Sequence, residues 1–195
     1  MDELALHAAS VAGDLSKLRL ALQAGAEVDA EDDRGKTALM LASANGHTVA
    51  MLMLLEAGAA VDSTDTDRMT ALMLASANGH TVTMLMLLEA GAAVDSKNTR
   101  LQTALMKASF GGHTGVLRVL LEAGAEVDST STDNWTSLMC ASRRGYDSAV
   151  RVLLEAGAMV DAKSATERTA LTFASEKGHT GVVRLLLEAG AAMDW

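Results

Sequence analysis

The chain of 195 residues has no proline, one cysteine and only five aromatic residues. The single cysteine, Cys140, excludes an internal disulfide and is typical of a reducing compartment. The longest apolar stretches, such as MLMLL, are far too short to span a bilayer, and the start MDELALHAAS lacks the pattern of a secretion signal. We therefore expect no membrane insertion and an intracellular location, in the cytoplasm or the nucleus.

Basic residues are scarce in the first half of the chain, and the formal net charge of the whole chain is −9. Residues 1–96 carry 5 Lys and Arg against 14 Asp and Glu, whereas residues 97–195 carry 11 of each kind. An excess of negative charge repels a phosphate backbone, so we expect no nucleic-acid partner. Because the two halves have different surfaces, we also expect them to have different roles.

A recognisable reactive centre is also missing. Four histidines recur at one position of a repeating pattern, His47, His80, His113 and His179. Ligands of one zinc ion each lie about 2.0–2.1 Å from it, whereas packed helices are roughly 8–10 Å apart. These rings therefore cannot share an ion, and we expect them at a turn before a helix. The GGHTG run at 111–115 lacks the Lys-Ser/Thr pair of a phosphate loop. We expect no catalytic activity, cofactor or metal.

The chain does contain a repeat of 33 residues. The run TALMLASANGHTVAMLMLLEAGAAVDS at 37–63 returns at 70–96, and the only change is from Ala50 to Thr83. The same step links Thr37, Thr70, Thr103, Thr136 and Thr169, and two glycine series with this step contain twelve of the sixteen glycines. A fixed period of this length indicates stacked repeats.

Each repeat predicts two helices and a turn. The threonine stands before an Ala-Leu run, where its hydroxyl can cap the first helix, and the first glycine suits the left-handed position that ends it. A second helix follows, such as 48–57, and a polar turn leads into the next repeat. Neither helix buries its apolar face alone, so the repeats must stack. We expect one all-α domain over residues 1–195, with repeats at approximately 1–31, 32–64, 65–97, 98–130, 131–163 and 164–195.

The 33-residue period, the word TALM, the Gly-His pair between the helices and the closing segment LLEAGAxVD resemble the ankyrin repeat along the whole chain. The resemblance implies a solenoid of helix-turn-helix units with protruding turns, whose turn tips and inner helices form a concave groove for partner proteins. The family's word is T-P-L-H, but here Ala or Ser replaces Pro, and only His7 keeps the histidine. We expect methionine to fill that space at Met40, Met73, Met106 and Met139. The recurring carboxylates should be part of the scaffold, at Asp29, Asp62, Asp95, Asp128, Asp161 and Asp194.

The repeats differ most at the positions that the resemblance assigns to the groove. Repeats two and three carry small residues there, whereas repeats four to six carry Arg100, Lys107, Phe110, Trp135, Arg143, Arg144, Arg168, Phe173 and Lys177. Trp and Arg are enriched where binding energy concentrates. We therefore expect the groove to hold an acidic or phosphorylated segment of another protein, with arginines pairing its carboxylates or phosphates. The alternative is that these are ordinary solvated side chains, with Phe110 and Phe173 partly packed.

A second candidate surface lies on the outer helices. Positions that normally face solvent carry Val49, Leu52, Val82 and Leu85 in repeats two and three. An exposed apolar patch often marks an interface, so self-association, or a structural role within a larger assembly, is the alternative function. Extra aliphatic residues that merely support helix packing would give the same pattern. Later repeats carry arginines instead, and we expect Arg118, Arg151 and Arg184 to pair with Glu122, Glu155 and Glu188, four residues on.

Overall fold

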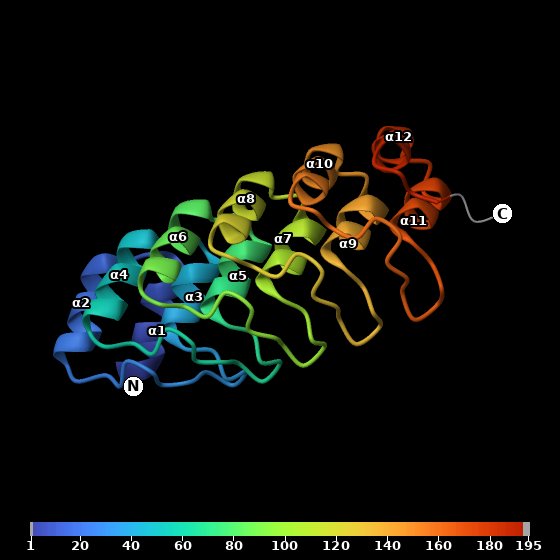
Figure 1. Ribbon diagram of the computed structural model, residues 1–195. Helices are drawn as coiled ribbons and strands as arrows, with labels where there is room; N and C mark the ends of the chain where they lie inside the picture. Colours follow the sequence, from blue (N-terminus) through green and yellow to red (C-terminus); the bar gives the residue numbers. More distant parts are fainter. Residues whose placement is uncertain (1, 193–195) are drawn as a thin grey trace. The chain divides into compact units, whose positions relative to one another are not determined.

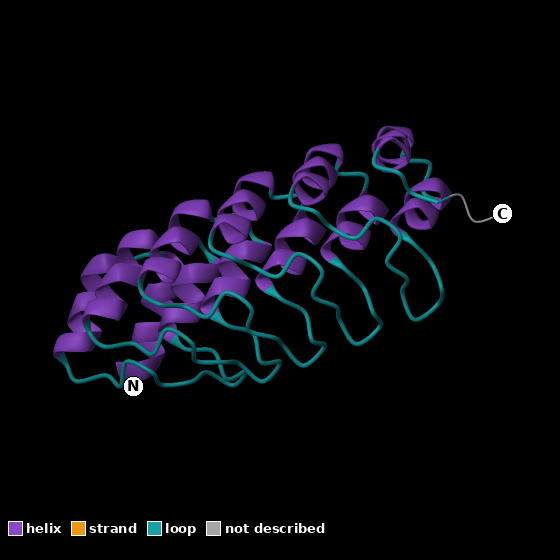
Figure 2. Ribbon diagram, in the orientation of Figure 1, coloured by secondary structure: helices purple, strands orange, loops and turns teal. Residues whose placement is uncertain are grey.

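The computed structural model describes residues 2–192, so Met1 and residues 193–195, which include Asp194, lie outside the described part. Twelve α-helices and no strands occur within residues 2–192 (Figure 2). The contacts group into two compact units, a first unit of residues 1–99 and a second unit of residues 100–195. The all-α helix-turn-helix fold is confirmed, whereas a single domain over residues 1–195 stays a prediction.

The first unit contains three helical hairpins (Figure 1). Its helices are α1 (Asp2–Ala12), α2 (Leu15–Gln23), α3 (Ala38–Ala44), α4 (Thr48–Glu56), α5 (Ala71–Ala77) and α6 (Thr81–Glu89). The first helices of the hairpins, α1, α3 and α5, pack in a row as the inner layer, and α2, α4 and α6 form the outer layer.

The second unit repeats this two-layer arrangement. Its helices are α7 (Ala104–Gly111), α8 (Thr114–Glu122), α9 (Ser137–Arg144), α10 (Asp147–Glu155), α11 (Ala170–Glu176) and α12 (Thr180–Glu188). The inner helices α7, α9 and α11 pack in sequence, and so do the outer helices α8, α10 and α12.

Threonine caps start the inner helices, as expected. At each of the five positions the hydroxyl accepts a hydrogen bond from the amide three residues on, for example from Met106 to Thr103 at 3.4 Å. In the last repeat Thr172 also bonds back to Thr169, which completes a capping box. The four methionines Met40, Met73, Met106 and Met139 are buried in the core beside these caps, which confirms that methionine fills this space.

The Gly-His pairs join neighbouring repeats. Gly46 has φ 70°, and a Cβ added there would lie 2.6 Å from Nδ1 of His80 in the next repeat. The other ring nitrogen of His80, Nε2, donates to the carbonyl of Ala44 at 3.0 Å. Glycine is therefore required both by the left-handed backbone and by the ring that packs on it. His80 stands directly before α6, so its predicted position at a turn is confirmed.

Asp carboxylates make a second link between repeats. Asp62 accepts a hydrogen bond from the Ala93 amide at 3.0 Å, and Asp29, Asp128 and Asp161 bond to the corresponding amides of the repeats that follow them. Their expected scaffold role is confirmed. The expectations for Arg118 and Arg151 were wrong, because Arg118 pairs with Glu155 of the next repeat at 3.8 Å and Arg151 forms no ion pair within residues 2–192. Arg184 pairs with Glu188 at 3.9 Å as expected.

Candidate functional site

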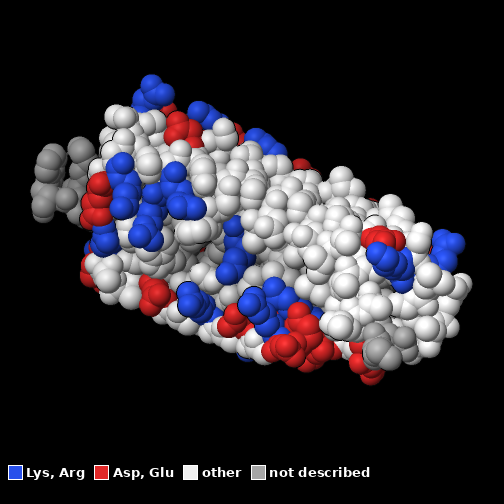
Figure 3. All heavy atoms as spheres, turned by 180° about the vertical axis from the view of Figure 1, so that it is seen from behind, with Lys and Arg blue, Asp and Glu red and all other residues white. Residues whose placement is uncertain are grey.

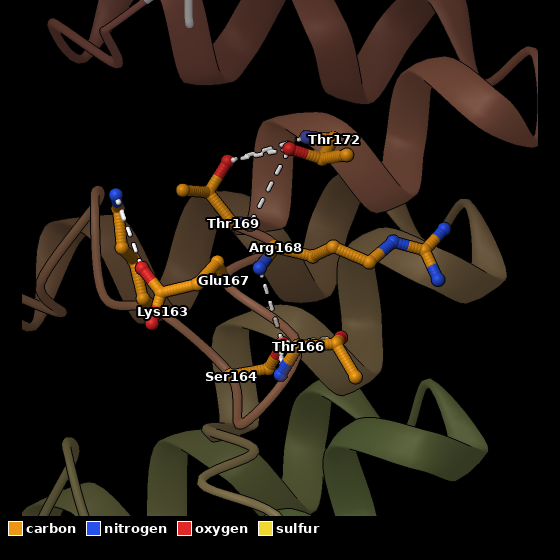
Figure 4. A network of polar contacts seen from close by, with 7 residues as sticks. All are labelled: Lys163, Ser164, Thr166, Glu167, Arg168, Thr169 and Thr172. Carbon is orange, nitrogen blue, oxygen red and sulfur yellow. Dashed lines mark hydrogen bonds and ion pairs between the residues drawn. The ribbon is translucent and has the colours of Figure 1, made fainter.

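The turn before each inner helix fixes the direction of the residue at its end. In the fifth repeat the Ser131 hydroxyl accepts hydrogen bonds from the amides of Asp133 (3.4 Å) and Trp135 (3.2 Å). In the sixth, Ser164 accepts from Thr166 and Arg168 in the same way (Figure 4). Consecutive turns are also joined, because the Ala165 amide donates to the Asp133 carbonyl at 2.9 Å. Trp135 and Arg168 are thus held on a bonded row of turns.

Trp135 lies in a stack of aromatic rings and arginines. Its ring centroid is 4.4 Å from that of Phe173, with the planes tilted by 38°. The guanidinium of Arg143 lies 5.3 Å from the Trp135 centroid, and that of Arg168 lies 4.5 Å from the Phe173 centroid. Such contacts stabilise the side chains by about 0.5–1 kcal/mol each at exposed sites. The Trp135 ring is therefore held by contacts with both Phe173 and Arg143.

A similar pair lies on the neighbouring repeat. The guanidinium of Arg144 sits 4.4 Å from the centroid of Phe110, whose side chain is 46% exposed. Arg143 and Arg144 occupy the last turn of α9, where the partial negative charge of the helix end favours cations. We call Phe110, Trp135, Arg143 and Arg144 the arginine–aromatic cluster. Its residues come from two adjacent inner helices and the turn between them.

The charges of this region differ in how far they are already neutralised. Arg168 forms an ion pair with Glu176, and Lys107 donates to the Gln102 side chain at 2.7 Å. For Arg143 and Arg144, by contrast, no carboxylate of residues 2–192 lies within ion-pair distance. Figure 3 shows Lys and Arg side chains gathered on one face of the second unit. Two stacked guanidinium groups are therefore available to an incoming anion.

A pocket of about 250 Å³ opens beside the cluster. It is lined by Gln102, Met106, Phe110, Ser131, Asp133, Trp135, Cys140 and Arg143. Burial raises the pKa of the Cys140 thiol to about 12, although the positive charges of Lys107 and Arg143 oppose this. The thiol is thus neutral at physiological pH and forms part of an uncharged wall.

The nine residues predicted for the groove do not all reach the surface. Trp135 and Arg143 are in contact, and Arg144 stacks on Phe110. Phe173, however, is only 3% exposed. It therefore packs against Trp135 and presents almost no surface to a partner. Lys177 is exposed just after α11, and Arg100 is exposed on a turn whose carbonyl accepts the Thr132 amide at 3.0 Å.

Sequence reasoning missed the parts of the site that carry no aromatic ring or positive charge. Ser131 orients Trp135, and Asp133 lines the pocket. A signal for Ser131 existed, because Asp32, Asp65 and Ser164 stand at the same repeat position and accept the same pair of amides. At Asp32, partial burial opposes ionisation, but the amides of Lys36 and Arg34 outweigh it and lower the pKa of the carboxyl.

The candidate patch on the outer helices lies in the first unit. Val49, Val82 and Leu85 are 56%, 63% and 39% exposed, whereas Leu52 is half-buried. Leu20 of α2, in the outer layer of the same unit, is also 64% exposed. The patch is therefore exposed at three of its four predicted residues.

Comparison with known protein families assigns the fold. The family described as "Ankyrin repeats (3 copies)" matches residues 5–98, 54–131 and 105–194. The chain belongs to the ankyrin-repeat family. Ankyrin repeats are generally non-enzymatic and bind other proteins, so this chain is a protein–protein interaction module. No curated protein matches it.

No group of three His, Cys, Asp or Glu residues within 2–192 is arranged to hold a metal ion. None of the helices α1 to α12 is long and apolar enough to cross a membrane.

Proposed function

We propose that the second unit binds an acidic or phosphorylated segment of a partner protein at the arginine–aromatic cluster. The observation that carries this proposal is the pair Arg143 and Arg144, each stacked on an aromatic ring and neither paired with a carboxylate of residues 2–192. The proposed surface also includes Lys107, Lys177 and Arg100, together with Arg168, whose charge is paired with Glu176, and Phe173 as support. The partner is a protein, and neither nucleic acid nor membrane is required.

Stacking prepares the two arginines for anion binding. A guanidinium that lies over a ring keeps the edge with its N–H groups free, and this edge matches a carboxylate or phosphate with two parallel hydrogen bonds. The ring restricts the side chain before the partner arrives, so less conformational entropy is lost on binding. An exposed ion pair alone contributes only about 0–1 kcal/mol. Two prepared arginines beside an apolar surface can contribute more than separate pairs would.

Affinity capture with a cluster variant tests this function. The variant combines Trp135→Ala with Arg143→Ala, and its control combines Leu187→Ala with Arg151→Ala on the exposed outer face of the same unit. We expect a stoichiometric partner to bind the unchanged chain and the control but not the cluster variant. Circular dichroism establishes that all three proteins are folded. A partner retained by the folded cluster variant would refute the proposed site.

A second candidate function rests on the exposure of Val49, Val82 and Leu85. Through this patch, together with Leu52, the chain would associate with itself or act as a structural subunit of an assembly. Sedimentation from micromolar to millimolar concentration tests self-association, with Val82→Lys as the interrupting variant. A monomeric mass throughout would exclude it.

We also propose an intracellular location, in the cytoplasm or nucleus, because the buried thiol of Cys140 has no second cysteine to pair with. Fractionation of native cells tests this location.

A further inference from the structure

The pocket beside the arginine–aromatic cluster is lined by both apolar and polar residues. Met106, Phe110, Trp135 and Cys140 are the apolar ones, and Gln102, Ser131, Asp133 and Arg143 are polar or charged. A cavity of about 150 Å³ lined by apolar side chains holds benzene. The 250 Å³ here therefore leave room for one large side chain.

The apolar wall is formed before any ligand arrives. The Trp135 ring packs against the buried Phe173 ring and against Arg143, while Ser131 fixes its backbone. Met106 and Cys140 are almost fully buried in the inner helices. Binding would require little reorganisation, which is a property of the pockets that receive anchor residues.

This combination of residues occurs once in the row of repeats. The pocket lies between the end of one inner helix, at Phe110, and the turn of the next repeat, at Trp135. The residue pairs one or two repeat lengths away are Ala44 with Met69, Ala77 with Gln102, and Arg143 with Arg168. None of these pairs contains an aromatic residue, so the pair Phe110 and Trp135 has no aromatic equivalent at those positions.

The two charged residues that line the pocket determine which charge an entering side chain can carry. Asp133 disfavours an acidic side chain inside the pocket, and Arg143 disfavours a basic one. An uncharged apolar side chain meets neither penalty. Carboxylates that stay outside the pocket can still reach Arg143 and Arg144, because consecutive residues of an extended segment are only about 3.3 Å apart.

We propose that this pocket receives one aromatic or long aliphatic side chain of the partner segment, flanked on the same segment by acidic residues that contact Arg143 and Arg144. The inference rests on the proposed function and adds to it the residue that sets specificity. The occupant is thus a linear acidic motif with a single apolar anchor, and a segment of acidic residues alone would bind weakly.

Synthetic nonapeptides test the anchor directly. The first has a central Phe with two Glu and then two Gly on each side, and the second has Ala in place of Phe. A third has Gln in place of each Glu, and a fourth has phosphoserine in place of the two Glu next to Phe. Because the chain has two tryptophans, a protein with Trp195→Phe reports Trp135 fluorescence alone during titration.

We expect the Phe peptide to bind about tenfold more tightly than the Ala peptide, because an apolar side chain of this size gains about 1.5–3 kcal/mol on burial and 1.4 kcal/mol corresponds to a factor of ten. The Gln peptide should lose most of the affinity. Comparison of the Glu and phosphoserine peptides shows whether carboxylate or phosphate is the preferred anion.

Two variants test whether the preference for the Phe peptide depends on this pocket. Phe110→Ala, measured with the same fluorescence reporter, should abolish the preference for Phe over Ala, and its half-exposed position means that folding is retained. Leu187→Ala, a similarly exposed apolar residue on α12, should leave the preference unchanged. Equal affinity for the Phe and Ala peptides would overturn the anchor but keep the proposed acidic-segment function. If the preference for the Phe peptide persisted in the Phe110→Ala variant, the assigned pocket would be wrong. If none of the peptides bound, the anchored acidic motif would be wrong. Affinity capture tests the proposed function independently of both results.

Discussion

Arg68 adopts a backbone conformation that suits glycine, and replacing it should stabilise the protein. Its φ is 57°, at the turn position where the preceding repeat has Gly35 with φ 72°. The left-handed conformation costs a residue with a Cβ roughly 1–2 kcal/mol. The Arg68 side chain is exposed and forms no ion pair within residues 2–192, so its removal should lose almost no favourable contact.

The expected gain follows from two opposing contributions. Glycine relieves the left-handed penalty, but it gives the unfolded chain more conformational freedom, which costs about 0.4–1 kcal/mol. The difference predicts that Arg68→Gly raises the free energy of unfolding by about 0.5–1 kcal/mol. For a slope of about 2–3 kcal/mol per molar urea, the midpoint moves up by roughly 0.3 M. Circular dichroism at helical wavelengths follows this transition.

Arg68→Ala is the decisive control. It removes the same charge and side chain but keeps the Cβ, so the free energy of unfolding should change by less than about 0.5 kcal/mol. Asn134→Gly should gain less than Arg68→Gly, because asparagine tolerates its φ of 54° better than arginine does. If Arg68→Ala stabilised the protein as much as Arg68→Gly, charge and not backbone strain would be the cause.

Three further predictions concern the links between repeats, the buried thiol and the cluster. Asp62→Ala should lower the free energy of unfolding by about 0.5 kcal/mol in urea titrations because the Ala93 amide loses its acceptor at an exposed site, whereas Asp62→Asn should lose less. The raised pKa of Cys140 means that only the unfolded thiol ionises between about pH 9 and 12, so stability should fall by up to about 1.4 kcal/mol per pH unit in this window, and Cys140→Ala should remove this contribution. Arg144→Gln should weaken binding of the Phe peptide about fivefold at low salt and much less at high salt, because exposed charge pairs are screened.

The fold could be predicted because its signals are local and occur repeatedly. A threonine hydroxyl bonds to an amide three residues on, and a glycine adopts a positive φ, whatever lies elsewhere in the chain. The threonine series and the glycine series therefore located the helices before any contact between repeats was known. Methionine in place of histidine also followed from volume and polarity at one position.

The details of the candidate site could not be predicted in the same way, because they depend on how one repeat faces the next. Phe173 and Phe110 both lie at variable inner-helix positions. Phe173, however, is buried against Trp135, whereas Phe110 is half-exposed beside Arg144. Arg118 reaches across to Glu155, although Glu122 has the better spacing within its own helix. Orientation between adjacent repeats decides each of these outcomes.

The distribution of charge favours the arginine–aromatic cluster as the binding site that we propose. An acidic segment bound there would meet Arg143 and Arg144 without a competing carboxylate in ion-pair distance within residues 2–192. Residues 1–96, by contrast, carry 14 Asp and Glu against 5 Lys and Arg. Repulsion there disfavours the same segment along three repeats that would otherwise offer similar turns and helices. The near identity of the second and third repeats is compatible with a single binding site. Binding at only one place in a row of copies requires the other copies to bind poorly.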